Sequence, residues 1–322
     1  MKLLKDSDCR TFEQLCSLSQ GAVQATMIKY LNSKYNEVAY TKDYIYATGD
    51  IPIALVAHMD TVFKYPADEV FYDRQKNVMW APNGLGADDR AGVFAIIQII
   101  KRGLRPHIIL TTDEEIGARG ASVLSTIPCP FEDLRYIIQL DRRGSNDCVF
   151  YDCDSPDFVD YIESFGFVEA IGSFSDISVI CPAWKIAGVN LSIGYRDEHS
   201  TSEVLFVGQM LHTIDRVCAM LQASDIPSFE YIPSKYAVRW YNLCMPEDEN
   251  HCSNCGKEFL PEELIAVKTA NGSIKYYCID CVASGKVDFC CCCGEAYEHE
   301  GDPKKTFNMC EDCYYDTIYE YK

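Results

Sequence analysis

Ionisable side chains directly follow several short apolar runs, and this pattern constrains the fold more than any other feature of the chain. The runs 53–57, 107–111 and 136–140 have the length and composition of strands buried on both faces. A helical pattern at 88–102 separates the first two. This alternation is typical of a layered α/β domain with helices on both faces of a sheet. In such folds ligands bind beyond the carboxyl ends of the strands.

The rest of the first 225 residues continues the alternation. We expect further helices at 11–34, 120–124, 156–164 and 201–221, and further strands at 148–151 and 189–193. Internal repeats and low-complexity segments are absent from this part of the sequence.

Charge and apolar content exclude several partners. The 322-residue chain has a formal net charge of −19, so we expect neither nucleic acid nor an anionic membrane as its main partner. The N-terminus lacks the apolar core of a secretory signal, and no apolar run approaches the roughly 20 residues of a bilayer crossing. The sequence therefore favours a cytoplasmic protein.

The 18 cysteines are unevenly distributed. Eight are scattered over the first 244 residues, whereas ten lie between Cys252 and Cys313. The intervening stretch carries three prolines and an acidic run, as a linker often does. We therefore predict a first domain at 1–225, a linker at 226–250, and two small modules at 251–285 and 286–322.

Each small module contains two CxxC pairs, the spacing of a four-cysteine zinc ribbon. The predicted zinc ligands are Cys252, Cys255, Cys278 and Cys281 in the first module, and Cys290, Cys293, Cys310 and Cys313 in the second. Disulfides are the alternative, but a reducing compartment favours two structural Zn²⁺ ions. Because Cys291 and Cys292 lie between predicted ligands, the choice within that run stays open. Residues 246–322 hold 7 Lys and 16 Asp+Glu, so a protein-interaction or self-packing module is expected rather than a nucleic-acid binder.

Imidazole and carboxylate groups gather at the predicted strand ends of the first domain. They are His58, Asp60, Asp88, Asp89, Glu114, Glu115, Asp141 and His199. Such a set suits zinc or another divalent first-row metal. On a strand, His58 and Asp60 share one face, so Asp60 can hold the second nitrogen of the imidazole. The adjacent Glu114 and Glu115 can point in two directions, so that one binds metal and the other acts as general base.

The order HxD, GADDRAG, DEEIGARG, a single Asp and a late His resembles the co-catalytic di-zinc exopeptidases. This group includes peptidase T, carboxypeptidase G, the glutamyl aminopeptidases and zinc aminopeptidases with a phosphorylase/hydrolase-like core. The similarity covers roughly residues 15–222. It implies a three-layer α/β core built on a mixed sheet, with two catalytic metal ions that are Zn²⁺, Co²⁺ or Mn²⁺.

The resemblance also implies residue roles. His58 and Asp141 would bind one metal, Glu115 and His199 the other, Asp88 would bridge them, Asp60 would orient His58, and Glu114 would be the general base. The choice of Asp88 over Asp89 as the bridge rests on the Arg-Ala-Gly that follows them.

Part of the group carries a separate lid or dimerisation domain between the last Asp and the last His ligand. Here Asp141 and His199 are 58 positions apart, and we expect core elements between them rather than a lid. The segment 173–178 resembles a Ser-Asp loop of the group, so Asp176 either lines the substrate cleft or caps a turn. Arg142 and Arg143 either hold a substrate carboxylate or are ordinary loop residues.

These expectations combine into a metal-dependent exopeptidase, of aminopeptidase type, that acts on small peptides. A di-metal amidohydrolase that deacylates N-acyl amino acids is the alternative within the same site. A binding protein with an inactive metal site is the alternative from another class. The sequence leaves open the peptide sequence cleaved, the end attacked, the native metal and the oligomeric state. It also leaves open the role of the cysteine-rich tail and whether Asp88 or Asp89 bridges the metals.

Overall fold

The computed structural model describes residues 2–153, 155–233, 251–257, 264–268, 274–282, 287–289 and 296–298. The chain forms two compact units, Met1–Lys235 and Tyr236–Lys322, which we describe separately. Among the helices of the described residues, none combines the length and the apolar character that a membrane crossing requires.

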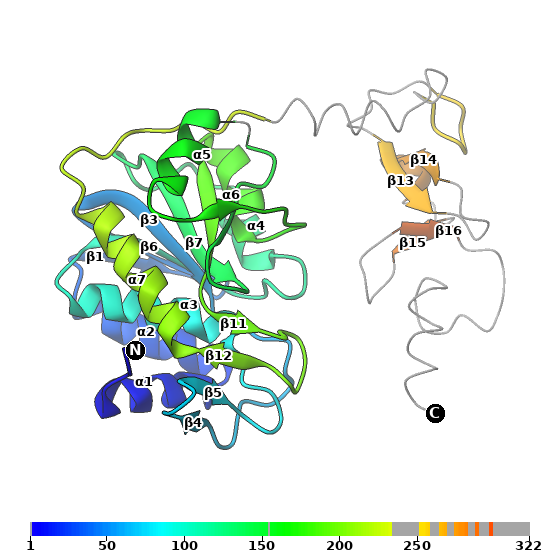
Figure 1. Cartoon of the computed structure of the whole chain (residues 1–322). Coiled ribbons are helices and arrows are strands. Elements are labelled where there is room, and N and C mark those ends of the chain that lie inside the picture. Colours follow the sequence, from blue (N-terminus) through cyan, green and yellow to red (C-terminus); the bar gives the residue numbers. More distant parts are fainter. Residues whose placement is uncertain are drawn as a thin grey trace. The chain divides into compact units, whose positions relative to one another are not determined.

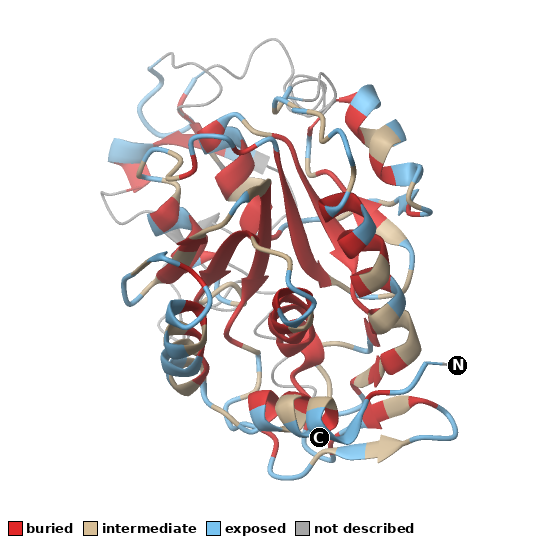
Figure 2. Cartoon of the chain, turned by 90° about the vertical axis from the view of Figure 1, so that its left-hand side faces the viewer, coloured by how far each residue is buried: buried red, intermediate tan, exposed pale blue. Residues whose placement is uncertain are grey.

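An eight-stranded mixed sheet forms the centre of the first unit (Figure 1). Its strands, in spatial order, are β1 (Glu37–Tyr40), β2 (Tyr44–Thr48), β6 (Pro106–Thr111), β3 (Ile51–His58), β7 (Tyr136–Arg142), β10 (Gly188–Ser192), β8 (Asp147–Val149) and β9 (Val168–Glu169). The four central strands β6, β3, β7 and β10 are parallel. These are the apolar runs of the sequence, and they are buried along almost their whole length (Figure 2).

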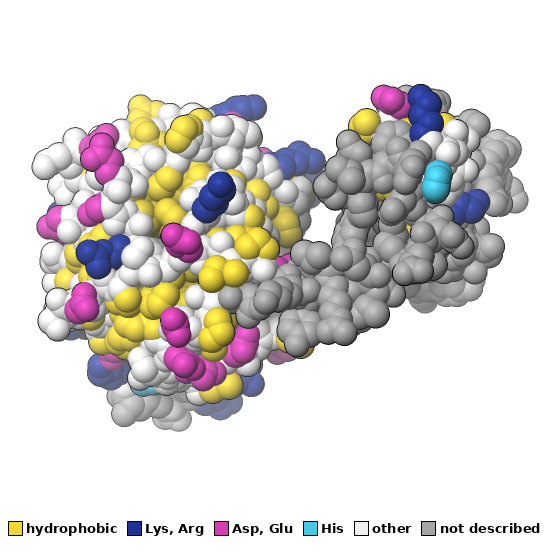
Figure 3. All heavy atoms as spheres, turned by 90° about the horizontal axis from the view of Figure 1, so that it is seen from above, with side chains coloured by type: hydrophobic (Ala, Val, Ile, Leu, Met, Phe, Trp, Pro, Cys, Tyr) yellow, Lys and Arg dark blue, Asp and Glu magenta, His cyan; other side chains and the backbone are white. Residues whose placement is uncertain are grey.

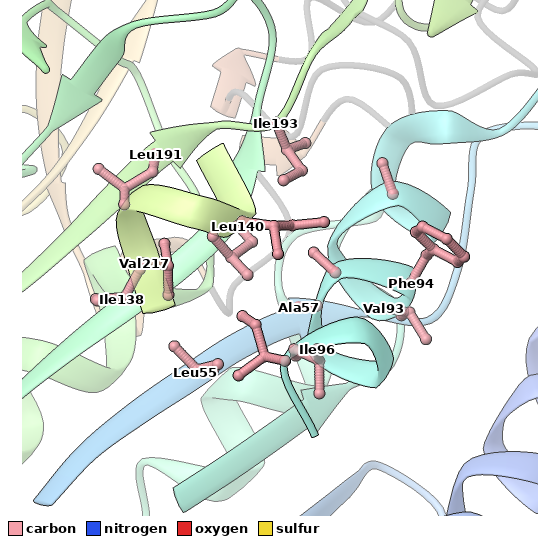
Figure 4. Packing of buried hydrophobic residues seen from close by; sticks show 14 of the residues in the cluster. Leu55, Ala57, Val93, Phe94, Ile96, Ile138, Leu140, Leu191, Ile193 and Val217 are labelled. Atoms are coloured by element: carbon pink, nitrogen blue, oxygen red, sulfur yellow. The ribbon is translucent and has the colours of Figure 1, made fainter. Parts of the chain in front are cut away.

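Helices cover both faces of this sheet, because alternate residues of each strand point to opposite faces. On one face, Leu55 and Ala57 of β3 belong to a core built with α1 (Asp6–Cys16), α2 (Gln20–Asn32), α3 (Ala87–Lys101), α5 (Pro156–Glu163) and α7 (Val207–Leu221). On the other face, Ala54 and Val56 pack with α4 (Arg119–Leu124) and α6 (Asp176–Trp184). Figure 4 shows the first core, where side chains of β3 and β7 meet those of α3 and α7. The predicted α/β architecture with a large sheet is therefore confirmed.

A second, smaller sheet of the first unit has the order β11 (Tyr195–Arg196), β12 (Val204–Phe206), β5 (Val78–Trp80) and β4 (Phe71–Asp73). Between Asp141 and His199, the described residues supply β8, β9 and β10 to the large sheet, together with α5 and α6. On the face that Figure 3 shows, the acidic, basic and hydrophobic side chains of the described residues are interspersed.

Two predicted helices have different bounds in the structure. The single helix predicted at 11–34 is two helices in the structure, α1 and α2. Ser19 is the N-cap residue of α2, because its Oγ accepts a hydrogen bond from the backbone N–H of Ala22. The helix predicted at 201–221 is wrong for its first residues, 201–206. There β12 pairs antiparallel with β5, and α7 begins only at Val207.

The described part of the second unit contains a sheet of order β14 (Ile274–Cys278), β13 (Leu264–Lys268), β16 (Ala296–Glu298) and β15 (Val287–Phe289). A short helix, α9 (Ile279–Cys281), follows β14 directly. Its small core includes Cys252, Leu264, Tyr276, Tyr277 and Cys281.

Candidate metal centre

The carboxyl ends of the parallel strands β3, β6 and β7 lie at one edge of the large sheet, and they bring the predicted site residues together. His58 ends β3, Glu114 and Glu115 follow β6, and Asp141 lies near the end of β7. The first turn of α3 and the loop after β11 add Asp88 and His199.

His58 is fully buried and has a carboxylate on each side of its ring. Its Nδ1 is 3.2 Å from Asp60 Oδ1, and its Nε2 is 3.1 Å from Asp88 Oδ1 and 3.5 Å from Asp141 Oδ1. The contact with Asp60 fixes the orientation of the imidazole and leaves Nε2 facing the two other carboxylates.

His199 contacts the other oxygen of the Asp88 carboxylate. Its Nε2 is 3.3 Å from Asp88 Oδ2 and 2.9 Å from Glu115 Oε2. The φ angle of His199 is 62°, in the left-handed region that a residue with a Cβ rarely adopts. Asp88 therefore presents one oxygen to the His58 group and the other to the His199 group.

The neighbouring Asp89 points elsewhere. Its Oδ2 accepts a hydrogen bond from the backbone N–H of His58 at 3.2 Å, and its Oδ1 accepts one from the backbone N–H of Gly92 at 2.8 Å. Asp88 and Asp89 both have non-helical backbone angles, with ψ values of 102° and 41°. This local departure from the helix separates the two carboxylates, so that Asp89 ties α3 to β3 while Asp88 faces the centre.

Backbone hydrogen bonds hold the acidic residues after β6. The two oxygens of Asp60 accept from the backbone N–H groups of Glu114 at 3.1 Å and Glu115 at 3.0 Å. Asp60 thus connects the His58 ring to the segment that carries both glutamates.

Asp141 is held by groups that sequence reasoning did not select. The Tyr195 hydroxyl donates to its Oδ1 at 3.0 Å, and Ser175 Oγ and Gln139 Nε2 donate to its Oδ2 at 2.9 and 3.1 Å. These donors restrict the carboxylate to one orientation, with Oδ1 toward His58.

Glu203 is another residue that sequence reasoning missed. It is fully buried, and its oxygens accept hydrogen bonds from the backbone N–H groups of Gly86 at 2.6 Å and Asp88 at 3.0 Å. A carboxylate in this place accepts hydrogen bonds from backbone N–H groups at the start of α3 that have no acceptor within the helix. Its negative charge also interacts favourably with the helix dipole. The sequence offers no local sign of this contact, because Asp88 and Glu203 are 115 positions apart.

The centre concentrates negative charge. Burial raises the pKa of Glu114 to about 9 and that of Asp141 to about 6, and nearby carboxylates add to both shifts. The pKa of His199 is raised to about 10 by its contacts with Asp88 and Glu115. Glu115 Oε1 is buried, and no described group forms a hydrogen bond with it. A divalent cation would compensate this charge and give the free oxygen a partner.

Two groups of potential ligand atoms share Asp88. One atom each from His58, Asp88 and Asp141 lie within 4.8 Å of one another, and so do atoms from Asp88, Glu115 and His199. Imidazole nitrogen and carboxylate oxygen are donors that zinc, cobalt and manganese accept. The residues present therefore fit two divalent ions that share a carboxylate.

A cavity of about 280 Å³ opens onto the centre. It is lined by Asp88, Glu114, Glu115, Asp141, Arg142, Arg143, Tyr151, Ile171, Gly172, Ser173, Phe174, Tyr195, Glu198 and His199. A second cavity of about 430 Å³ shares Glu115 with the first, and its walls include Phe63, Tyr65 and Ile116. The centre thus borders one polar and one more apolar space.

In the second unit, the sulfur atoms of Cys252, Cys255, Cys278 and Cys281 lie within 4.8 Å of one another. Gly256 has a φ of 67°, and its N–H donates to the Cys252 carbonyl at 2.8 Å, as a tight turn after a CxxC pair requires. Although burial opposes it, backbone N–H donors lower the pKa of Cys252 to about 6. The other predicted ligands, Cys290, Cys293, Cys310 and Cys313, lie outside the described residues.

Comparisons with known proteins place the fold. No family model matches the chain, and no curated protein matches its sequence. A tripeptidase from Staphylococcus aureus has 13% sequence identity and a TM-score of 0.55, with 67% of this chain and 98% of that chain covered. A TET aminopeptidase from a Thaumarchaeota archaeon has 14% identity and a TM-score of 0.54, with 69% and 98% covered.

Aminopeptidase PepT from Bacillus cereus is also similar, with 15% identity, a TM-score of 0.52, and 67% and 98% of the two chains covered. At these identities the likeness establishes the fold. This chain has the mixed α/β fold of these peptidase structures.

Asp176 does not line the described cavity at the centre. It is the first residue of α6 and is fully buried, and one of its oxygens accepts a hydrogen bond from the Thr111 hydroxyl. Its other oxygen, Oδ1, has no hydrogen-bond partner among the described residues. Burial raises the pKa of Asp176 to about 7. Asp176 does not cap the helix either, because Ser175 is the N-cap residue of α6 and neither oxygen of Asp176 accepts a hydrogen bond from a described backbone N–H.

We predict that Asp176→Asn makes stability less dependent on pH. The folded-state pKa of about 7 exceeds the reference value of 3.8, so the folded protein binds this proton more tightly than the unfolded chain does. The stabilisation is complete below about pH 4 and is lost as the pH rises through 7. Urea denaturation of the metal-free protein should show wild type losing stability relative to Asp176→Asn between pH 4 and 8. Asp225→Asn, at an exposed position, is the control, and parallel curves for wild type and Asp176→Asn would contradict the prediction.

Proposed function

We propose that the first unit is a two-metal aminopeptidase that removes the N-terminal residue of short peptides. The observation that carries this proposal is the position of Asp88, whose two oxygens face His58 and His199 separately. The likeness of the fold to a tripeptidase and to aminopeptidases supports peptides as the substrate class.

Two divalent ions, Zn²⁺ or in its place Co²⁺ or Mn²⁺, would be held by the residues of the two ligand groups. His58, Asp88 and Asp141 would hold one ion, and Asp88, Glu115 and His199 the other. Bound ions would supply an activated water and would polarise the carbonyl of the scissile amide. Asp89 would bind neither ion, because its oxygens already accept backbone hydrogen bonds.

The protein's own side chains would then position groups and move one proton. Asp60 holds Nδ1 of His58, so that Nε2 is available as a ligand. Glu114 lines the cavity beside the centre and is the proposed general base. It would take a proton from water and pass it to the leaving amine. Taking up that proton requires the ionised carboxylate. The positive charge of bound metal would lower the pKa of Glu114 from its raised value and make that form available.

We predict that Glu114→Gln loses most of its hydrolytic activity and keeps its metal. Removing a general base lowers kcat by about 10²- to 10⁴-fold, whereas the ligand set stays complete. Kinetics on a mixed peptide library, with elemental analysis of metal per chain, measures both effects. Glu132→Gln, at an exposed position, is the matched control and should behave as wild type.

Three results would contradict this assignment. Full activity in Glu114→Gln would remove Glu114 as the base. Hydrolysis of N-acyl amino acids without hydrolysis of peptides would favour the deacylase. A metal-loaded wild type that cleaves neither substrate class would favour a binding protein.

For the second unit we propose a structural Zn²⁺ held by Cys252, Cys255, Cys278 and Cys281, within a zinc ribbon at 251–285. A second ribbon at 286–322 remains a proposal from the sequence, as do the linker at 226–250 and a role in self-packing or protein interaction. Because four thiolates at tetrahedral spacing bind zinc strongly, the metal would contribute to the folding of this small unit.

We predict that Cys255→Ser lowers the zinc content by about one ion per chain and leaves peptide hydrolysis by the first unit intact. Elemental analysis with a parallel assay measures this. Cys129→Ser is the control, because Cys129 lies outside the cysteine cluster. An unchanged zinc content in Cys255→Ser would contradict the proposed zinc site.

A further inference from the structure

The cavity at the centre is lined by five acidic side chains and by two arginines, Arg142 and Arg143. Asp88, Glu114, Glu115, Asp141 and Glu198 all border this space. A negatively charged part of a substrate would be repelled by these groups wherever metal does not compensate them. Its favourable position in the cavity is therefore beside a cation.

Arg142 is largely buried, with 16% of its side chain exposed, yet few of its donors are used. Its Nη2 donates to the Ile171 carbonyl at 3.1 Å. Its Nε is buried and has no hydrogen-bond partner among the described residues, and it forms a long ion pair of 3.7 Å with Asp147 Oδ2. A buried donor without an acceptor is costly unless a ligand supplies one. Arginine stays charged at all relevant pH values and matches a carboxylate with two parallel hydrogen bonds.

The other arginine of the cavity is engaged. Arg143 has 65% of its side chain exposed, and its Nη1 is 2.9 Å from Glu198 Oε1. This pairing leaves Arg142 as the better receptor for an anionic group among the described cavity residues.

Gly172, which lines the cavity together with Arg142, packs closely against its neighbours. A Cβ built on Gly172 would lie 2.8 Å from Val149 Cγ1, 3.1 Å from Tyr151 Cε1 and 3.5 Å from Arg142 Nη1. The position nearest Val149 is too close for a Cβ, so glycine allows this segment to pack against Val149 and Tyr151, with Arg142 Nη1 at ordinary contact distance. Tyr151 and Phe174 also line the cavity and add aromatic side chains to its wall.

We propose that Arg142 binds a carboxylate of the substrate and so makes this aminopeptidase selective for peptides that place a negative charge in the cavity. This inference rests on the proposed function. The carboxylate has two possible sources, an acidic N-terminal side chain or the C-terminus of a very short peptide, and both present the same chemistry to the guanidinium.

Two matched peptide pairs separate the sources. Glu-Ala-Ala-amide and Gln-Ala-Ala-amide differ only in the charge of the N-terminal side chain. Ala-Ala and Ala-Ala-amide differ only in the charge of the C-terminus. In one pair, the metal-loaded wild type should cleave the charged member with a kcat/KM about tenfold or more above that of the neutral member, since charge-assisted hydrogen bonds are strong in a desolvated site. The pair that shows the preference identifies the source.

Arg142→Gln should remove this preference, mainly by lowering kcat/KM for the charged peptide, and should retain hydrolysis of the neutral one. Arg142→Lys keeps the positive charge but lacks the paired N–H donors of the guanidinium, so it should retain a smaller preference. Arg143→Gln removes the same charge one position away and should retain the full preference. Binding provides a second readout. Calorimetry on Glu114→Gln should give a lower Kd for the charged peptide, and the double variant with Arg142→Gln should lose that difference.

Wild type that cleaves both members of both pairs equally would overturn this inference and leave the proposed function standing. A preference that persists in Arg142→Gln, or one that Arg143→Gln abolishes equally, would also overturn it. Absence of all peptide hydrolysis by the metal-loaded wild type would instead reject the proposed function, and this inference with it.

Discussion

The arrangement of the centre depends on how the backbone holds the carboxylate of Asp88 between two imidazoles. Glu203 accepts hydrogen bonds from the N–H groups of Gly86 and Asp88, and this fixes the entry into α3. Asp89 accepts from the N–H of His58 and so joins the same turn to the end of β3. Two buried carboxylates thus serve as backbone anchors, which leaves Asp88 to face His58 and His199.

Concentrating acidic groups at one sheet edge is unfavourable unless a positive charge compensates them. The raised pKa values of Glu114 and Asp141 express this cost. Bound cations would relieve it at the centre itself. Arg142 lines the same cavity, and it would offer compensation to a substrate instead. The excess of acidic groups in this cavity would therefore account both for metal binding and for the binding of a substrate carboxylate by Arg142 rather than elsewhere in the cavity.

The sequence was informative where the signal is local. Fully buried parallel strands such as β3, β6 and β7 are apolar along their length, and their positions followed from composition alone. The strands β5 and β12 have three residues each, too few for a period, so their pairing was not predictable. The break between α1 and α2 lies within one apolar pattern, and the capping Ser19 marks the start of α2.

The candidate site shows the same division. Residues at strand ends could be selected because their types suit metal chemistry, and the structure gathers them at one edge. Tyr195, Ser175 and Glu203 could not be selected, since each acts through a contact distant in sequence. The different directions of the Asp88 and Asp89 carboxylates depend on backbone geometry that no pattern of residue types contains.

The most direct test of this account is crystallography of the zinc-loaded protein with anomalous diffraction at the zinc absorption edge. If two ions share Asp88, two peaks should lie in the first unit, one on each side of Asp88, with His58 and Asp141 bound to one ion and Glu115 and His199 to the other. Bridging by Asp89, a single peak, or no peak beside Asp88 at saturating zinc would contradict it.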